Sequence, residues 1–528
     1  MKRFNVTGTC VGHKHYMVDI SEKLDEIEKL VEQEHYFTIN RARQYGKTTT
    51  LFHLAKRLNA KNGYLCARIS FGNLGLGAFE TEKNFCGMFL RKISESLAFS
   101  DASEEYAKNW YNPDVLCIES LDRHITKMCK GAKVVLMIDE VDKSSNNRLF
   151  LHFLGMLREK YLFRQTDEDY TFHTVILAGV TDIKSLKLKM INDGMHETLK
   201  EEGRIINSPW NIAASFNVDM SFSAEDVSTM LHEYELDKKT GMDISAVAFE
   251  INKQTNGYPF LVSRICQCID EELKKNWTTE GVIQAVQIIL GERNVLFEDI
   301  AKNLENDKNL YDFMYELLIV GQTKTLNYGV PVISLADTFG YIKTRSNGSR
   351  KLAVSNRIFE IWMTHYFATK DEIAQKRNRV HGHIYLDVIK DGKFDMAACL
   401  TKFAEHYKEI YSHFDESFLE RHGRLLFLSF LTPLLNGQGN YYIESQFTDM
   451  RRMDIVVDFE GQQNIVELKL WRGEAAHELA YEQLLGYMDS KNAKEAFLLT
   501  FDFRKQKTEE YKNEWIKFGN KRIFDVVV

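Results

Sequence analysis

Over the first third of the chain, short runs of apolar residues alternate with longer stretches whose apolar residues recur at helical spacing. Four such apolar runs lie at residues 35–40, 64–71, 133–141 and 173–182. Uninterrupted apolar strands between amphipathic helices are typical of a parallel sheet buried on both faces. The pattern therefore predicts an α/β domain over residues 1–222, with helices on both sides of the sheet.

From residue 223 onward the pattern becomes helical. Ser223 stands three positions before Asp226 at the start of an amphipathic stretch, which is a signal for a helix N-terminus. More helical stretches follow the breaker at 255–259. We predict a small helical domain over residues 223–300.

Residues 301–370 combine helices with two strand-like arms around Asn347-Gly348, a dipeptide typical of hairpin turns. This order resembles a winged helix. Four basic residues decorate the hairpin, namely Lys343, Arg345, Arg350 and Lys351. They are consistent with contacts to a DNA backbone and equally with a solvated charged turn, so both interpretations stay open.

The last part of the chain begins with a polar helical stretch over residues 371–410, which we interpret as a helical linker. Residues 411–528 then read as helix, three strands, helix and strand. These segments lie at 416–435, 440–447, 452–459, 464–470, 475–490 and 495–503. The predicted element order of this domain is αβββαβ.

Composition agrees with a protein of several globular domains, because 528 residues are too many for one hydrophobic core. No run approaches the roughly 18 apolar residues that span a bilayer, and the N-terminal segment lacks the apolar core of a signal peptide. Eight cysteines without a C-x-x-C pair favour reduced thiols. The net charge of −7 gives bulk nucleic-acid binding no support, although a local basic patch would suffice. We expect a cytoplasmic protein with no membrane partner.

The first candidate site follows the first predicted strand, where Gly46-Lys47-Thr48 precedes a helical stretch. Backbone N–H groups at a helix start bind phosphate. Gly46 lets the backbone approach closely, Lys47 neutralises the β- and γ-phosphates, and the Thr48 hydroxyl ligates Mg²⁺. Arg41 stands where the usual loop has its leading glycine, and the Gly-Lys-Thr sequence alone is a weak signal.

Two acids, Asp139 and Glu140, end the third apolar run and supply the second half of a nucleotide site. Asp139 would hold Mg²⁺ through water, and Glu140 would orient and deprotonate the attacking water. Strand ends often carry solvated acids, but a Gly-Lys-Thr loop about 90 residues upstream favours an ATP site. Thr181, after the next strand, would sense the γ-phosphate, although turn chemistry explains it almost as well.

The second candidate site is a D-x12-E-x-K pattern formed by Asp454, Glu467 and Lys469. Because the pleat of a strand has period two, Glu467 and Lys469 project from one face. The two carboxylates can hold Mg²⁺ or Mn²⁺ against a phosphodiester, and Lys469 can stabilise the transition state. E-x-K on a strand is also common as a solvated face. Glu444 and Asp458 are further acids nearby.

Five stretches together carry a family resemblance: residues 37–51, 134–142, 178–182, 208–216 and 255–265. With them, the chain resembles the AAA-ATPase-like proteins of bacteria, relatives of the archaeal and STAND-type P-loop ATPases that are typically followed by a PD-(D/E)XK nuclease domain. The resemblance covers essentially the whole chain. It implies an α/β multidomain fold with a P-loop parallel-sheet ATPase core, a helical lid, a winged-helix-like segment and a C-terminal restriction-endonuclease-like domain.

The same resemblance accounts for the unusual start of the phosphate loop. In that family the loop commonly begins Asn-Arg-Pro-Arg, so Arg41 follows the family pattern, while Ala42 stands in place of the proline. Arg43 would add positive charge near the phosphates. We include Arg41, Arg43 and Thr49 in the expected nucleotide site.

In the lid, the resemblance implies a Gly-x-Pro turn, which Gly257-Tyr258-Pro259 matches. It makes Arg264 a candidate sensor of the γ-phosphate, and a surface arginine on the lid helix is an equally good interpretation. Asp19 matches an upstream motif of the family without an assigned role. Arg148 and Arg158 are alternative arginine-finger candidates.

In the C-terminal domain, Gln483 and Tyr487 lie one helical turn apart as Q-x-x-x-Y. This spacing resembles an extra motif of RecB-like nucleases. Glu420 matches the glutamate that many such nucleases carry on their first helix. The resemblance therefore implies a nuclease site made of Glu420, Asp454, Glu467, Lys469 and Gln483.

Together these features predict an ATP-binding and ATP-hydrolysing protein whose nucleotide state controls a Mg²⁺-dependent nuclease acting on DNA. The alternative is a STAND-like nucleotide switch that binds DNA or a protein partner, with the nuclease fold as a non-catalytic scaffold. DNA versus RNA, the direction of control, and a monomer versus a homo-oligomer stay open.

Overall fold

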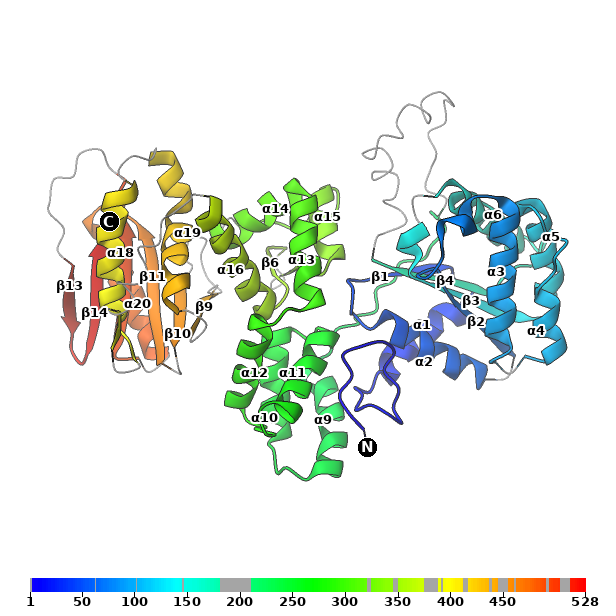
Figure 1. Ribbon diagram of the computed structural model, residues 1–528, viewed down its shortest axis with the longest axis horizontal. Coiled ribbons are helices and arrows are strands. Elements are labelled where there is room, and N and C mark those ends of the chain that lie inside the picture. Colours follow the sequence, from blue (N-terminus) through cyan, green and yellow to red (C-terminus); the bar gives the residue numbers. More distant parts are fainter. Residues whose placement is uncertain are drawn as a thin grey trace. The chain divides into compact units, whose positions relative to one another are not determined.

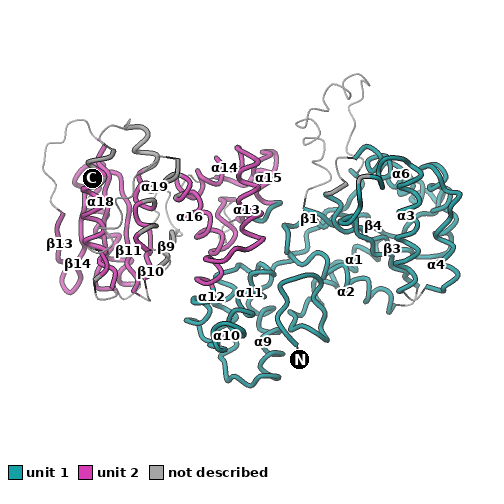
Figure 2. Tube along the Cα trace, in the orientation of Figure 1, with its two compact units in different colours: residues 1–285, 338–340 teal, residues 286–337, 341–528 magenta. Residues whose placement is uncertain are grey.

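The computed structural model describes residues 2–61, 63–100, 102–144, 147–180, 210–320, 324–344, 350–374, 388–390, 393–411, 416–435, 439–444, 454–459, 462–490, 493–503 and 513–528. The chain forms two compact units (Figure 2). They comprise residues 1–285 with 338–340, and residues 286–337 with 341–528. Across the described ranges, no helix is both long enough and apolar enough to cross a membrane.

The first unit is built on a parallel sheet with the strand order β1-β4-β3-β2 (Figure 1). The strands are β1 (Phe37–Asn40), β2 (Tyr64–Ser70), β3 (Lys133–Asp139) and β4 (Thr174–Gly179). The helices around it are α1 (Ser21–Glu32), α2 (Lys47–Asn59), α3 (Glu82–Leu97), α4 (Glu104–Trp110), α5 (Ile118–Cys129) and α6 (Arg148–Arg164), with the 3₁₀ turns η1 (Leu76–Phe79) and η2 (Val141–Ser144). The predicted parallel α/β sheet is confirmed.

Helices cover both faces of the sheet, and the strand residues on both faces are accordingly apolar. Strand β3 is buried at every position after Lys133. On one face, Leu136 and Ile138 pack in a single cluster with Phe89 of α3 and Phe153 of α6. Figure 1 shows α1 and α2 on the other side of the sheet. The uninterrupted apolar run of the sequence thus corresponds to a strand between two layers of helices.

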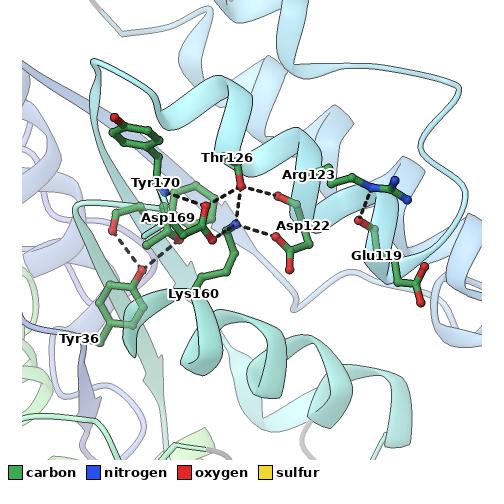
Figure 3. Close-up of polar contacts among 10 residues, drawn as sticks. Tyr36, Glu119, Asp122, Arg123, Thr126, Lys160, Asp169 and Tyr170 are labelled. Atoms are coloured by element: carbon green, nitrogen blue, oxygen red, sulfur yellow. Dashed lines mark hydrogen bonds and ion pairs between the residues drawn. The ribbon is translucent and has the colours of Figure 1, made fainter. Parts of the chain in front are cut away.

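A buried ion network fastens this helical layer (Figure 3). The Lys160 ammonium of α6, with 1% of its side chain exposed, lies 2.6 Å from carboxylate oxygens of both Asp122 and Asp169. It also donates to the Thr126 hydroxyl at 2.7 Å. A buried charge is tolerated where opposite charges and hydrogen bonds surround it. Lys160 therefore joins α6 to α5 and to the segment that precedes β4.

The rest of the first unit is helical, in the region where the sequence predicts a helical domain over residues 223–300, and that domain assignment stays a prediction. This region contains α9 (Ala224–Lys238), α10 (Ile244–Thr255), α11 (Pro259–Glu271) and α12 (Thr279–Gly291), although the border between the two units falls within α12. The start of α9 is as predicted. Asp226 N donates to the Ser223 hydroxyl, and Ser223 N donates to the Asp226 carboxylate, both at 3.0 Å.

The second unit begins with helices and a short antiparallel hairpin. Its elements are α13 (Val295–Asn306), α14 (Lys308–Tyr315), the π-helical turn η4 (Glu316–Val320), α15 (Pro331–Thr338), β5 (Ile342–Thr344), β6 (Leu352–Val354) and α16 (Arg357–Ala374). The two arms of the predicted hairpin pair in antiparallel fashion. Arg345 and the Asn347-Gly348 turn lie outside the described residues, and the winged-helix assignment remains a prediction.

The C-terminal part of this unit is a mixed sheet in the order β13-β14-β12-β11-β10-β9. Its elements are β7 (Ile389–Lys390), β8 (Lys393–Phe394), α18 (Met396–Tyr411), α19 (Glu416–Leu435), β9 (Gly439–Glu444), β10 (Asp454–Phe459), β11 (Gln462–Leu470), α20 (Glu474–Ser490), β12 (Glu495–Phe501), β13 (Glu514–Phe518) and β14 (Lys521–Val527). From α19 to β12 the elements follow the order αβββαβ, as predicted. Strands β13 and β14 extend the sheet beyond that prediction.

Part of the segment interpreted as a linker belongs to this domain. Helix α18 packs on β12, β14 and α19, and its Cys399, Leu400 and Phe403 side chains are fully buried. An amphipathic helix with such a face needs a sheet to cover it, which the polar residues around it had obscured. The linker interpretation is therefore wrong for residues 396–410.

Within the second unit, the hairpin segment is also fixed to the C-terminal sheet. The Arg424 guanidinium of α19 donates to the carbonyl oxygens of Ile319 at 2.7 Å and Leu318 at 3.3 Å, both in η4. The ring of His365 in α16 lies 4.3 Å from that of Tyr441 in β9. η4 and α16 thus pack directly against α19 and β9 of the sheet domain.

Candidate functional site

The phosphate loop connects β1 to α2 as the sequence predicts. Gly46 is the residue before the helix and has φ +81°, a left-handed conformation that suits glycine. Gln44 also has a positive φ, of 56°. This turn directs the first N–H groups of α2 toward the loop, where a phosphate would accept from them.

Lys47 turns back onto the loop that it follows. Its ammonium donates to the carbonyl oxygens of Arg41 and Ala42, each at 2.7 Å. Burial lowers the pKa of Lys47 to about 8, while the nearby carboxylates of Asp142 and Asp139 oppose that shift. The ammonium is thus held at the phosphate end of the site by acceptors that nucleotide phosphates can replace.

The two halves of the predicted metal site meet in the structure. The Thr48 hydroxyl donates to Asp139 Oδ2 at 2.6 Å, across 91 positions of sequence. Asp139 ends β3 and is 5% exposed. A hydroxyl and a carboxylate are hard oxygen donors of the kind that Mg²⁺ prefers. These residues therefore fit the metal that the Gly-Lys-Thr loop implies.

Glu140 follows directly and rests against the end of β2. It has φ +57°, and its Oε2 accepts a hydrogen bond from the Ser70 hydroxyl at 3.2 Å. Ser70 pairs with Asp139 at the neighbouring ends of β2 and β3. The carboxylate reaches over Gly72, where a side chain would meet it. Glu140 thus has a defined resting place beside β2.

Asp142 is a site residue that sequence reasoning did not assign. Its Oδ2 accepts a hydrogen bond from Val180 N at 2.7 Å. Its two carboxylate oxygens lie so close to Gly179 that a β-carbon at that position would be 2.9 and 3.0 Å from them. Among the nearby charges that raise the pKa of Lys47, that of Asp142 is the strongest. Its position two residues after Glu140 was the available signal. This acid links the end of β4 to the phosphate loop.

A cavity of about 450 Å³ opens beside the loop. One wall is the loop and the start of α2, from Gln44 to Thr50. A second wall is the N-terminal segment, and a third comes from the helical domain. The lining residues outside the loop are Asn5, Val6, Thr7, Gly8, Cys10, Tyr16, Met17, Val18, Ile20, Lys23, Ile27, Met220, Phe222, Met230, Pro259, Phe260 and Ser263. Away from the loop the cavity is mainly apolar, as a planar base requires.

Three arginines of the expected site differ in their surroundings, and the charge of Arg43 is close enough to Lys47 to lower the pKa of that lysine. Arg41 donates to the carbonyl oxygens of Asn40 at 2.9 Å and Val218 at 3.0 Å. The carbonyl of Arg43 accepts from the Tyr258 hydroxyl. Arg264 pairs with Glu272 at 2.8 Å along its own helix. The described lining of the cavity includes none of the three, so their role in nucleotide binding remains a prediction.

The other expected residues of this site differ in how well they are placed. Thr49 lines the cavity, and its hydroxyl accepts from Cys10 N at 3.0 Å. Thr181 lies outside the described residues. The aromatic ring of Tyr45 in the loop packs edge-on against Tyr258 of the Gly-Tyr-Pro turn, with centroids 4.8 Å apart. The loop and the helical domain therefore meet through two tyrosines.

In the C-terminal sheet, the strand register aligns the predicted acids. Asp454 of β10 pairs directly with Glu467 of β11 on one side and with Glu444 of β9 on the other. Directly opposed residues of antiparallel strands project from the same face. The described residues include no cluster of three or more His, Cys, Asp or Glu arranged for a metal, but the side chains of Asp454 and Glu420 fall outside what is described.

Glu467 and Lys469 lie as the E-x-K spacing predicts. Glu467 is 2% exposed, and its Oε1 lies 2.5 Å from the Lys469 ammonium. Helix α20 covers this face, because its Leu484 and Tyr487 pack in one cluster with Ile465 of the same strand face. Gln483 is carried by that helix next to Leu484. The structure thus places the Q-x-x-x-Y helix over the acid-bearing face.

Asp458 has a different environment from Asp454. It lies at the far end of β10, is nearly buried, and accepts from the Gln463 amide at 3.3 Å. Its pairing partners in the sheet are Gln463 and Asn440, which carry no charge. The register therefore favours Asp454 over Asp458 as the partner of Glu467.

Comparison with known proteins gives the chain its family. It is similar to the Walker-type ATPase of Pyrococcus abyssi, with 10% identity and a TM-score of 0.45 over 68% of this chain and 98% of that one. It is also similar to a RuvB mutant of Thermotoga maritima, with 12% identity and a TM-score of 0.32 over 69% of this chain and 96% of that one. A third similar structure is the ORC2 protein of Aeropyrum pernix, with 10% identity and a TM-score of 0.32 over 63% of this chain and 88% of that one. No curated protein matches it. A family model described as an AAA-like domain matches residues 13–348, well over half of the chain. The chain therefore belongs to the AAA-like domain family and has a P-loop ATPase core.

Proposed function

We propose that the protein binds and hydrolyses ATP with Mg²⁺, and that its nucleotide state controls a metal-dependent phosphodiesterase in the C-terminal domain. Nucleic acid, with DNA as the expected form, would be the substrate of that second site. The observation that carries the ATP part is the 2.6 Å hydrogen bond between Thr48 and Asp139, beside an ammonium already held at the loop. The nuclease part is supported by the register of Asp454 and Glu467 next to Lys469.

In the proposed ATP hydrolysis, each group has one task. Lys47 exchanges the carbonyl oxygens of the loop for phosphate oxygens. Thr48 and Asp139 would hold Mg²⁺, which would supply positive charge opposite the phosphates. Glu140 leaves Ser70 and accepts a proton from the attacking water.

In the proposed phosphodiester cleavage, Glu467 and Asp454 would hold Mg²⁺ or Mn²⁺, which would supply a more acidic bound water. Lys469 would then leave the Glu467 carboxylate and neutralise charge that develops on the phosphate. The Lys469 ammonium lies against the buried Glu467 carboxylate, so both groups are already at the place where the metal and the phosphate would meet. Gln483 on the covering helix and Glu420 on α19 would complete the site.

Two experiments test these activities in the full chain. Glu140→Gln should bind ATP like the wild type and lose hydrolysis at least about 100-fold, the usual contribution of a positioned base. Glu80→Gln, at an exposed position, is the matched control. Cleavage is tested on single-stranded DNA, double-stranded DNA and RNA, with Mg²⁺ or Mn²⁺, with and without ATP. Wild-type protein that cleaves none of them under any nucleotide condition contradicts the nuclease proposal.

A second function is favoured by the resting positions of two side chains. Lys47 donates to its own loop and Glu140 accepts from Ser70, so both side chains have partners within the protein. These contacts suit a STAND-like switch that changes slowly between nucleotide states and binds DNA or a protein partner. Such a switch would retain nucleotide through purification and turn over less than once in many minutes, whereas the ATP-driven nuclease would not.

A further inference from the structure

The N-terminal strap, which we define as residues 2–20, runs between the two structures that enclose the cavity. Near each end it contacts helix α9: Tyr16 donates from its hydroxyl to Asp237 at 3.0 Å, and Asp19 N donates to the Thr229 hydroxyl at 2.9 Å. The Lys2 ammonium pairs with Glu233 of the same helix. The strap is thus bound to the helical domain before and after it passes the cavity.

Phe4 is the apolar anchor of the strap. It is 2% exposed, and its ring centroid lies 5.1 Å from that of Tyr16, 5.2 Å from that of Tyr234 and 5.8 Å from that of Trp277. Tyr234 and Trp277 belong to the helical domain. A phenylalanine enclosed by three aromatic rings is held by apolar contacts that its replacement with alanine would remove.

The middle of the strap is bound instead to the phosphate-loop helix. Cys10 N donates to the Thr49 hydroxyl at 3.0 Å, and the Cys10 carbonyl lies 3.0 Å from His53 Nε2. Thr49 follows Thr48, the residue that donates to Asp139. The strap therefore contacts the helical domain and the phosphate-binding helix at the same time.

Between these two attachments, Asn5, Val6, Thr7 and Gly8 line the cavity. Phe4 itself does not line it. The opposite wall includes Met230, Pro259 and Phe260 of the helical domain. If the phosphates of a nucleotide lie at Lys47 and Thr48, the base extends into the part of the cavity that these two walls bound.

We infer that Phe4 is a positioning residue for the base: by fixing the strap in the aromatic cluster, it holds residues 5–8 as one wall of the base pocket. The inference rests on the proposed nucleotide binding. Base binding would then tighten the strap onto the helical domain, because the same short segment contacts both. The coupling is reciprocal: a strap that is attached to the helical domain strengthens base binding, and a bound base strengthens the attachment of the strap by the same free energy.

The test compares ATP with inorganic triphosphate, which has the phosphates and lacks the base. Calorimetry on the full chain measures both affinities, with Mg²⁺, for the wild type, Phe4→Ala, Phe4→Leu and the matched control Phe99→Ala. Phe99 is 94% exposed, so its loss changes no packing. We expect Phe4→Ala to weaken ATP about tenfold or more and triphosphate less than twofold, and Phe4→Leu to restore most of the ATP affinity.

Three outcomes overturn the inference. Unchanged ATP affinity in Phe4→Ala shows that the anchor does not shape the pocket. An equal loss for ATP and triphosphate shows general damage to the fold instead of an effect on the base. Wild-type protein that binds ATP no more tightly than triphosphate has no base pocket at this place. Wild-type protein that binds neither ligand instead contradicts the proposed nucleotide binding itself.

Discussion

The Glu140 carboxylate occupies the space that a side chain on Gly72 would take. Its Oε2 lies 1.4 Å from the ideal position of a β-carbon at that glycine. The nearby Ser70 hydroxyl accepts a hydrogen bond from Gly72 N at 3.1 Å and donates one to the same Glu140 oxygen. A glycine and a serine at the end of β2 thus define where the proposed base of ATP hydrolysis rests.

Gly72→Ala should displace Glu140 from this resting place without touching the phosphate loop. The added methyl group occupies the position of the carboxylate, and a flexible side chain can move aside. We expect ATP affinity to change less than twofold, and the hydrolysis rate to change severalfold. Gly75→Ala is the control, because nothing lies within 4 Å of its β-carbon position. Equal rates for the two variants would show that the resting place has no influence on turnover.

Ser70→Ala removes the hydrogen bond and leaves the space open. One hydrogen bond to a charged group contributes roughly 1.5 kcal/mol, which corresponds to about a tenfold change. If this bond restrains Glu140, the basal kcat for ATP hydrolysis should rise by up to that factor, with KM unchanged. A steady-state assay measures both constants. A fall in kcat would instead mean that Ser70 assists the reaction.

The lowered pKa of Lys47 predicts how ATP binding depends on pH. Burial brings that pKa to about 8, whereas a lysine in the unfolded chain titrates near 10.4. The unfolded chain therefore binds more protons between these values, and the stability of the nucleotide-free protein should rise with pH across that window. ATP affinity should fall over the same window, because the neutral amine attracts phosphate less.

Calorimetric titration from about pH 6.5 to 9.5 measures that affinity, on either side of the shifted pKa. In Lys47→Arg the guanidinium stays charged throughout this range, so the slope above pH 8 should flatten even if the affinity is lower. A wild-type affinity that does not vary with pH would refute the assignment of Lys47 as the phosphate-binding cation.

Loss of the buried Lys160 ammonium should destabilise the first unit. In Lys160→Ala, Asp169 would remain largely buried without its cation, which costs about 3–5 kcal/mol for an unpaired partner. Lys160→Met fills the space of the lysine side chain but also leaves the carboxylates without a cation, so its loss of folding stability should equal that of Lys160→Ala or be slightly smaller. Thermal unfolding followed by circular dichroism measures the shift. Lys108→Ala, whose side chain is 72% exposed, should leave the transition in place.

Glu467 and Lys469 should separate metal binding from cleavage. Glu467→Gln removes a charged oxygen donor, so Mn²⁺ affinity and cleavage should fall together. Lys469→Met removes the cation that competes with the metal, so Mn²⁺ should bind at least as tightly while cleavage is lost. Glu478→Gln and Lys494→Met, both at exposed positions, are the controls. Cleavage retained in Lys469→Met would remove that lysine from the proposed site.

The sequence was most informative where local pattern decides structure. The apolar run ending in Asp139 predicts a buried parallel strand, and the period of two places Glu467 and Lys469 on one face; the structure agrees with both. The features that the sequence did not predict are contacts between segments that lie far apart in the chain. Arg41 was grouped with the phosphates by its position, but its guanidinium reaches the carbonyl of Val218. No local signal relates Gly72 to Glu140 or Phe4 to Trp277.

Arg424 has a practical consequence for dividing the protein. Its bonds to the Leu318 and Ile319 carbonyls mean that a fragment starting at residue 411 would leave that guanidinium without two of its acceptors. The same cut would uncover Tyr441 where His365 now covers it. A portable piece that carries Glu467 therefore has to include η4 and α16, and shuffling of this domain between proteins would have to move both elements with it.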